Sequence, residues 1–164
     1  MQDYRDRILI NTWKSEGNSI VLVTGVFDIL HLEHFRFLNK ARKSGDKLIV
    51  GIERDIRVKR IKGKDRPFYT ETNRVEQISN LKSVDLAFLL PEKFDNQEDW
   101  ELLIDNIRPN VYAVSSHTLW LENKRYIAEK FGAKLEIVHE YNPASSSTII
   151  IESNSGLFKK SEEL

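Results

Sequence analysis

Two histidines, three residues apart, follow a glycine and an apolar strand. Residues 20–24 are aliphatic or β-branched, Gly25 comes next, and His31 and His34 fall in the first turn of an expected helix. Side chains three apart on a helix point to the same side. A helix N-terminus has free backbone N–H groups and the positive end of its dipole, which together favour phosphate. We therefore predict that this stretch holds the phosphates of a nucleotide and that the imidazoles donate to phosphate oxygens.

The histidine pair alone has other interpretations. Two histidines at this spacing in an arbitrary helix are usually surface residues or hydrogen-bonded core residues. A metal site is a second alternative, but the chain has no cysteine and no third ligand lies nearby at a usual spacing. We therefore expect no metal held by protein ligands alone. The preceding strand, the glycine and the nearby Asp28 favour the phosphate site.

The stretch resembles the first signature of the HIGH-motif nucleotidyltransferases, in their cytidylyltransferase-like branch, which reads G-x-F-D-x-x-H-x-G-H. The matching residues here are Gly25, Phe27, Asp28, His31 and His34. In the family, the last glycine of the motif lets the nucleotide lie close against the helix. In this chain Glu33 replaces that glycine. An inward Glu33 side chain would clash with the nucleoside or repel phosphate, whereas an outward one would leave binding intact.

A basic segment, residues 53–70, follows the second expected strand. It could be a solvated loop, but it lies after the carboxyl end of a strand, where open parallel sheets bind ligands. A lysine aimed at departing pyrophosphate would stabilise the charge that develops there. Lys62 is the first candidate and Lys59 the second. The sequence VKRIKGKDRP within this segment resembles the matching loop of the heptose-1-phosphate adenylyltransferases, a subgroup of the family.

Other polar residues have two interpretations each. Arg66 and Arg74 could make ordinary surface pairs or take part in function. Ser115 follows the fourth expected strand, where the subgroup usually has a K-G-G-D-like turn; His117 could substitute there or begin the next helix. The late run Ser146-Ser147-Thr148 resembles the family's S-S-T motif, which implies that Ser147 and Thr148 bind the β- and γ-phosphates. A serine run by itself is typical of helix caps and loops.

Apolar segments and helical patterns alternate five times along the chain. We predict strands over residues 20–24, 47–52, 84–89, 111–114 and 135–139, and helices over 4–14, 30–44, 72–81, 98–107, 118–131 and 149–153. The second helix should turn Phe35, Leu38 and Ala41 inward. This order predicts an α/β fold: a single-domain, doubly wound (Rossmann-like), five-stranded parallel sheet with helices on both faces. Expected domains are a helical arm (1–18), a nucleotidyltransferase domain (19–153) and a loose polar tail (154–164).

The composition limits the partners of the chain. Its 164 residues contain 25 basic and 25 acidic side chains, so no global positive field favours nucleic acid. The absence of cysteine excludes disulfides. The longest apolar run, about five residues, is far short of the ~20 needed to cross a bilayer. The charged N-terminal residues lack a signal-peptide core. We therefore expect a cytoplasmic protein without a nucleic-acid or membrane partner.

The resemblance implies a reaction. An NTP, with ATP favoured and CTP as the alternative, would react with a sugar phosphate or alcohol phosphate and release pyrophosphate. The implied catalytic residues are His31, His34 and Lys62, and the implied nucleotide- and phosphate-binding residues are Gly25, Val26, Phe27, Asp28, Lys59, Ser115, Ser147 and Thr148. Mg²⁺ would accompany the triphosphate.

Two questions stay open at this stage. A catalytically silent nucleotide-binding or protein-interaction module on the same fold is the alternative to an enzyme. The resemblance also allows a homodimer, with Trp100 and Trp120 either at an interface or in the core.

Overall fold

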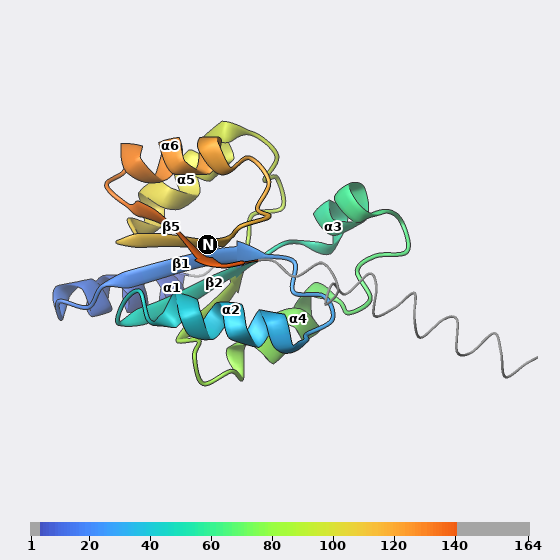
Figure 1. The fold of residues 1–164 in the computed structure, drawn as a ribbon, viewed down its shortest axis with the longest axis horizontal. Coiled ribbons are helices and arrows are strands. Elements are labelled where there is room, and N and C mark those ends of the chain that lie inside the picture. The colour runs from blue at the N-terminus through green and yellow to red at the C-terminus, as the bar shows by residue number, and fades with distance from the viewer. Residues whose placement is uncertain (1–3, 141–164) are drawn as a thin grey trace, which may run out of the picture.

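A single parallel sheet forms the centre of the computed structural model, which describes residues 4–140. The strands, in the order β3-β2-β1-β4-β5 (Figure 1), are β1 (Ile20–Gly25), β2 (Lys47–Ile52), β3 (Leu86–Leu89), β4 (Val111–Ser115) and β5 (Lys134–His139). β1 pairs with β2 on one side and with β4 on the other, so the strand order reverses beside β1. Open α/β sheets bind ligands at such a switch point. The predicted doubly wound fold is confirmed.

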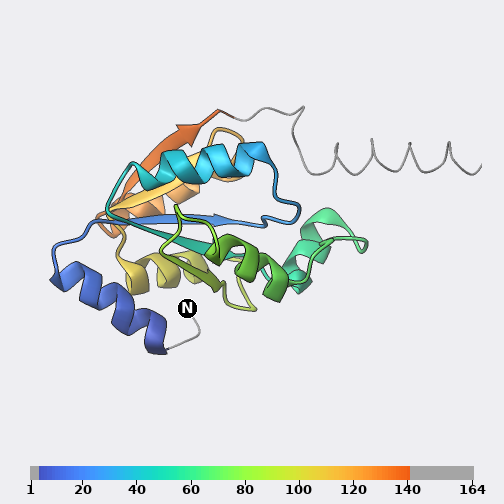
Figure 2. The ribbon, with the colours of Figure 1, turned by 90° about the horizontal axis from the view of Figure 1, so that it is seen from below.

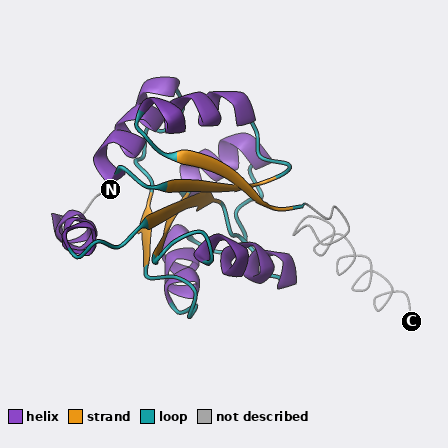
Figure 3. Cartoon of the chain, turned by 60° about the vertical axis from the view of Figure 1, so that its left-hand side comes forward, coloured by secondary structure: helices purple, strands orange, loops and turns teal. Residues whose placement is uncertain are grey.

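Helices cover both faces of the sheet (Figure 3). They are α1 (Tyr4–Ser15), α2 (Leu32–Arg42), α3 (Asp55–Lys62), α4 (Glu71–Ser79), α5 (Gln97–Ile107) and α6 (Leu121–Lys130). One core cluster contains buried side chains of α1, α5 and α6, and the other contains those of α2 and α4. Figure 2 shows α1 and α5 on the side of the sheet opposite α2. None of the helices within residues 4–140 is long and apolar enough to span a bilayer.

The central strand β1 is buried on both faces. Ile20 and Leu22 belong to the core cluster of α1, α5 and α6, while Val21 and Val23 belong to that of α2 and α4. Alternate residues of a strand point to opposite faces, so a continuous aliphatic run can serve two cores at once. The two cores fix β1 and thereby the position of the turn that follows it.

Some expected details are wrong. Phe35 is exposed, and Phe37 is buried beside Leu38 and Ala41, so the inward face of α2 is rotated from the expected one. The basic segment contains a helix, α3, because the fully buried Val58 anchors it and Gly63, at φ +99°, ends it. α6 begins only at Leu121, which leaves His117 in the preceding turn.

Three expectations concern residues that the structure does not describe. The helix expected over 149–153, the phosphate-binding residues Ser147 and Thr148, and the loose polar tail expected over 154–164 lie outside residues 4–140.

Candidate functional site

A cavity of about 510 Å³ opens at the carboxyl ends of the strands. Its lining includes Thr24 and Gly25 from the end of β1, Ser115 from the end of β4 and His139 from the end of β5. The sequence-predicted residues that line it are Gly25, Val26, Phe27, Asp28, His31, His34, Lys62 and Ser115. Lys59 is exposed on α3 and is not part of this lining. All four histidines of the chain line the cavity.

The turn between β1 and α2 has a constrained backbone. A Cβ atom on Gly25 would lie 2.8 Å from Cε2 of Phe27, so this position requires glycine. Phe27 is buried and has φ +50°, in the left-handed region that bulky residues rarely adopt. Such strain concentrates at functional sites. The backbone N–H of Glu53 donates to the Gly25 carbonyl at 3.0 Å and joins the ends of β1 and β2.

The two motif histidines stack on each other at the start of α2. Their ring centroids are 3.9 Å apart with an interplanar angle of 30°. Nδ1 of each ring is buried and has no hydrogen-bond partner among the described residues. Burial, followed by the nearby His31 and Lys62, lowers the pKa of His34 to about 3, although a hydrogen bond with the backbone of Ile29 opposes the shift. Burial also lowers the pKa of His31, opposed by Glu33. At neutral pH both rings are therefore neutral, and each can donate one N–H.

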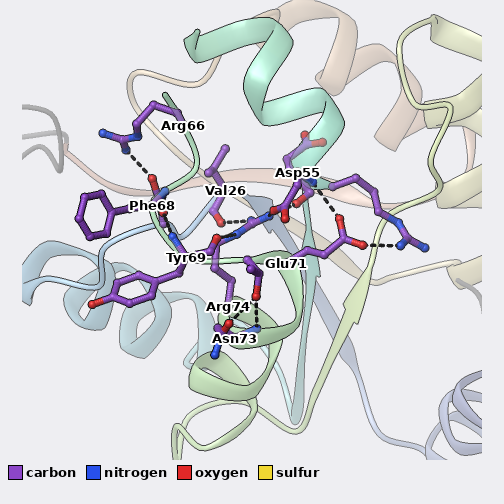
Figure 4. Close-up of polar contacts among 12 residues, drawn as sticks. Val26, Asp55, Arg66, Phe68, Tyr69, Glu71, Asn73 and Arg74 are labelled. Carbon is purple, nitrogen blue, oxygen red and sulfur yellow. Dashed lines mark hydrogen bonds and ion pairs between the residues drawn. The ribbon is translucent and has the colours of Figure 1, made fainter. Parts of the chain in front are cut away.

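The Asp28 carboxylate holds the segment that follows α3. Its Oδ2 pairs with Nη2 of Arg66 at 2.8 Å, and its Oδ1 accepts from the backbone N–H groups of Phe68 (2.7 Å) and Tyr69 (3.0 Å) (Figure 4). Asp28 is buried. Its contacts position the turn, and the Arg66 guanidinium is held in place by the same carboxylate.

Arg74 connects the same turn to the end of β2. Its guanidinium donates to the carbonyls of Val26 (2.6 Å), Glu53 (2.7 Å) and Tyr69 (3.1 Å) and to Oδ1 of Asp55 (2.7 Å) (Figure 4). The side chain is fully buried, so an ordinary surface pair is the wrong interpretation of this arginine. Nothing local in the sequence indicates this burial, because arginine is rarely found inside a protein.

Glu33 forms part of the cavity wall and points neither freely inward nor outward. Its Oε1 accepts from Arg36 at 2.6 Å, and its Oε2 lies 2.9 Å from Nε2 of His139. The hydrogen bond from Arg36, and then that from His139, lowers the pKa of Glu33 although desolvation raises it. The carboxylate is thus ionised and paired at neutral pH.

A second polar group lines the cavity from the side of α3, α5 and α6. Glu53 and Arg57 form an ion pair at 2.8 Å, and both are buried. Lys124 Nζ donates to Oγ1 of Thr118 at 2.7 Å and lies 5.1 Å from the centre of a Trp100 ring. Burial raises the pKa of Glu53 and lowers that of Lys124 to about 8. The sequence does not single out these residues, because they come from three separate elements.

The fold and the cavity together define a Rossmann-like α/β protein with a glycine turn and a helix start at the switch point of its sheet. Comparison with known proteins makes the class specific. The family model described as cytidylyltransferase-like matches residues 22–153. The chain belongs to this family, as its motif resemblance predicts.

Individual relatives agree with the family assignment. The bifunctional protein HldE of Geotalea uraniireducens (strain Rf4) is 32% identical over 154 residues, which are 93% of this chain and 30% of that protein. HldE of Geobacter sulfurreducens is 33% identical over 144 residues, 87% of this chain and 28% of that protein. The chain thus spans less than a third of the length of these relatives.

Solved structures share the fold. The lipopolysaccharide core biosynthesis protein from Thermoplasma volcanium GSS1 aligns with a TM-score of 0.61 at 29% identity, over 77% of this chain and 98% of that one. Pantothenate synthetase from Thermus thermophilus aligns with a TM-score of 0.56 at 12% identity, over 79% of this chain and 59% of that one. The second likeness concerns the fold alone.

Proposed function

We propose that the chain is a nucleotidyltransferase that joins the NMP part of an NTP to a sugar phosphate and releases pyrophosphate. The observation that carries this proposal is the stacked pair of neutral imidazoles at the start of α2, His31 and His34, whose Nδ1 atoms have no hydrogen-bond partner among residues 4–140. Membership of the cytidylyltransferase-like family and similarity to HldE support the reaction class. ATP is the favoured nucleotide because residues 58–67 resemble the loop of the adenylyltransferase subgroup, and CTP is the alternative.

The transfer requires no covalent enzyme intermediate. An oxygen of the acceptor phosphate attacks the α-phosphorus in line, and the bond from that phosphorus to the oxygen bridging to the β-phosphate breaks. Pyrophosphate leaves with the bonding electron pair. The enzyme accelerates such a step by positioning the reactants and by stabilising the charge that develops on the phosphate oxygens.

Each proposed catalytic group has a separate task. His31 and His34 donate neutral N–H groups to oxygens of the α- and β-phosphates. Lys62 neutralises the departing pyrophosphate. The pKa of Lys62 is lowered by burial and then by Arg66, although Asp28 opposes the shift. A poorly hydrated ammonium group interacts more strongly with an anionic ligand than a fully hydrated one does.

The remaining phosphate contacts come from the backbone of Gly25, Val26, Phe27 and Asp28 and from the hydroxyl of Ser115. Ser147 and Thr148 complete this proposed set from outside the described residues. Lys59 is the second choice for the pyrophosphate lysine, because its exposed position on α3 keeps it out of the cavity lining.

Mg²⁺ fits this site as a companion of the triphosphate. Among residues 4–140, no group of three or more His, Asp or Glu side chains could hold a metal ion. The Asp28 carboxylate is already engaged by Arg66 and by backbone N–H groups. Mg²⁺ usually binds through substrate phosphates and waters, and there it would neutralise part of the triphosphate charge.

The proposal is tested by pyrophosphate release from ATP and from CTP. Candidate acceptors are heptose 1-phosphate, glycerol phosphate and phosphocholine, and the His31→Ala and His34→Ala variants provide the background rate. We expect release with ATP and the sugar phosphate. Release no faster than that background with every pair would reject the transferase. Calorimetric NTP binding without turnover would then support the alternative, a silent nucleotide-binding module, which the substitution of glycine by Glu33 favours.

A further inference from the structure

The side of the cavity away from α2 contains three ionisable residues that the transfer step does not use. Glu53 follows β2, Arg57 lies on α3 and Lys124 lies on α6; we call them the charged cluster. All three line the same cavity as the histidines. Glu53 and Arg57 are each only 6% exposed. The cluster is therefore a set of largely desolvated charges that face the space where a substrate would bind.

Stability alone does not account for this cluster. Replacing a buried ion pair by apolar side chains of similar volume is often neutral or stabilising, because removing two charges from water offsets their attraction. The ammonium of Lys124 also lies over the Trp100 and Tyr112 rings, at 5.1 and 5.9 Å, instead of reaching bulk solvent. Polar groups kept at such a cost in a cavity are candidates for ligand recognition.

The chemistry of the charged cluster suits hydroxyl groups. It presents a carboxylate that accepts hydrogen bonds and two cations that donate them. The cations are partly neutralised, because Arg57 pairs with Glu53 at 2.8 Å and with Asp95 at 2.7 Å, and Arg60 shares Asp95. A site for a bare phosphate would have excess positive charge, whereas paired donors and acceptors match a ligand that is rich in hydroxyls.

An exposed indole stands at the same side of the cavity. Trp120 lines the cavity, is 59% exposed and has φ +54°, in the left-handed region. The Trp120 side chain is outside the core, and its backbone is in a conformation that bulky residues rarely adopt. The fold therefore keeps both an exposed indole and a strained backbone at this position. A large exposed aromatic face can cover the C–H face of a sugar ring.

We propose that the charged cluster binds the ring hydroxyls of the sugar phosphate acceptor and that Trp120 covers the sugar ring. This inference rests on the proposed function, since it assigns the acceptor to the same cavity. It names a specificity site at the part of the cavity formed by the end of β2, α3 and α6.

The test measures sugar phosphate binding directly, by calorimetry on the full chain, with mannose 1-phosphate and heptose 1-phosphate as probes. Glu53→Gln and Lys124→Met should each weaken binding by about tenfold or more, the range for losing a hydrogen bond to a charged group. ATP affinity should stay within about twofold, because the triphosphate binds to the other side. Trp120→Ala, at an exposed position, should weaken sugar phosphate binding by about threefold to tenfold without affecting the core.

The chain offers a matched control pair. Lys130 on α6 and Glu101 on α5 form an ion pair at 2.7 Å that lies outside the cavity lining. Glu101→Gln and Lys130→Met make the same chemical changes, the second on the same helix as Lys124, and should leave sugar phosphate binding unchanged. Thermal unfolding of each variant shows whether it is folded. If the cluster variants are unfolded, sugar phosphate binding by Trp120→Ala tests the proposal.

The possible outcomes separate this inference from the proposed function. No sugar phosphate binding by the wild type, or equal binding by wild type, Glu53→Gln and Trp120→Ala, would overturn the acceptor site. Pyrophosphate release that is equally fast with glycerol phosphate and sugar phosphate would also overturn it, although the transferase would stand. Binding that depends on the cluster, without any pyrophosphate release, would support the site and reject the transferase.

Discussion

The two sides of the cavity hold their polar groups in different charge states. On the α2 side, burial keeps His31 and His34 neutral, and the pKa of His34 falls to about 3. On the other side, Glu53 and Arg57 remain close enough to form an ion pair, and Lys124 has a pKa of about 8. The stacked histidines therefore offer neutral donors, whereas the charged cluster offers paired charges.

This difference matches two kinds of ligand. A triphosphate brings its own charge and its own cation, so neutral N–H donors and backbone amides can bind most of it, and Lys62 is the cationic side chain that we assign to the pyrophosphate. An uncharged polyol brings both donors and acceptors, and paired ionic groups can satisfy both. The proposed transferase needs both ligands in one cavity, with the acceptor phosphate between them.

The largest expected effect concerns Arg74, which connects the two sides through the carbonyls of Val26 and Glu53. Arg74→Met should destabilise the protein by about 3–5 kcal/mol, because it leaves buried carbonyls and Asp55 without their partner. Urea denaturation measures this loss. Arg125→Met, which removes an exposed pair to Glu122 at 3.9 Å, should cost under about 1 kcal/mol. Equal losses in the two variants would show that Arg74 does not hold the cavity together.

Next in size is the effect of the imidazoles on turnover. His31→Ala and His34→Ala should each lower kcat/KM by about 10²–10³-fold, the range for removing one donor to a developing oxyanion. Sugar phosphate binding should persist in both variants, because the charged cluster is intact. Pyrophosphate release and calorimetry on the same samples measure the two properties. Wild-type turnover in either variant would contradict the assignment of the histidines to the triphosphate.

A pH effect on stability follows from the neutral state of His34. Its pKa is about 3 in the folded chain and 6.5 in the unfolded chain, so the unfolded state binds a proton first as the pH falls. Stability that is present above pH 6.5 is therefore lost progressively between pH 6.5 and pH 3, by about 3 kcal/mol at pH 4.5. Urea denaturation of the wild type and of His34→Gln at pH 7 and pH 4.5 measures how much of the acid loss of stability is due to His34. An identical acid loss in both proteins would mean that His34 is charged in the native state.

The smallest effect concerns the cavity wall at Glu33. Glu33→Gly should raise ATP affinity by roughly threefold to tenfold, because it removes a side chain and a negative charge beside the phosphates. Glu33→Gln keeps the size and removes the charge, so the two variants separate crowding from repulsion. Calorimetry with ATP measures both. Weaker ATP binding by the glycine variant would instead make Glu33 a nucleotide contact.

The sequence predicted that the residues of the histidine side lie together, whereas it did not predict the whole charged cluster. The strand, Gly25, the helix start and both histidines are contiguous within residues 20–34, so local rules of strand, turn and helix bring them together. Within the charged cluster, Glu53 and Arg57 are only four residues apart but Lys124 comes from α6, and one of the two partners of Glu33, His139, is 106 residues away. Only the packing of α3 and α6 on the sheet brings these groups together. Tertiary packing also explains why Phe37 is buried where Phe35 was expected. The rotation of α2 about its axis depends on the elements against which it packs, and the sequence pattern does not reveal them.

The four histidines all line the cavity and therefore provide a direct test of the central claim that its α2 side binds a triphosphate. The measurement is an NMR titration of the imidazole signals with ATP, with His31 and His34 assigned from their alanine variants. The account predicts saturable shifts of the His31 and His34 signals, reproduced by tripolyphosphate alone. Shifts confined to His117 and His139, or no shifts at millimolar ATP, would contradict it.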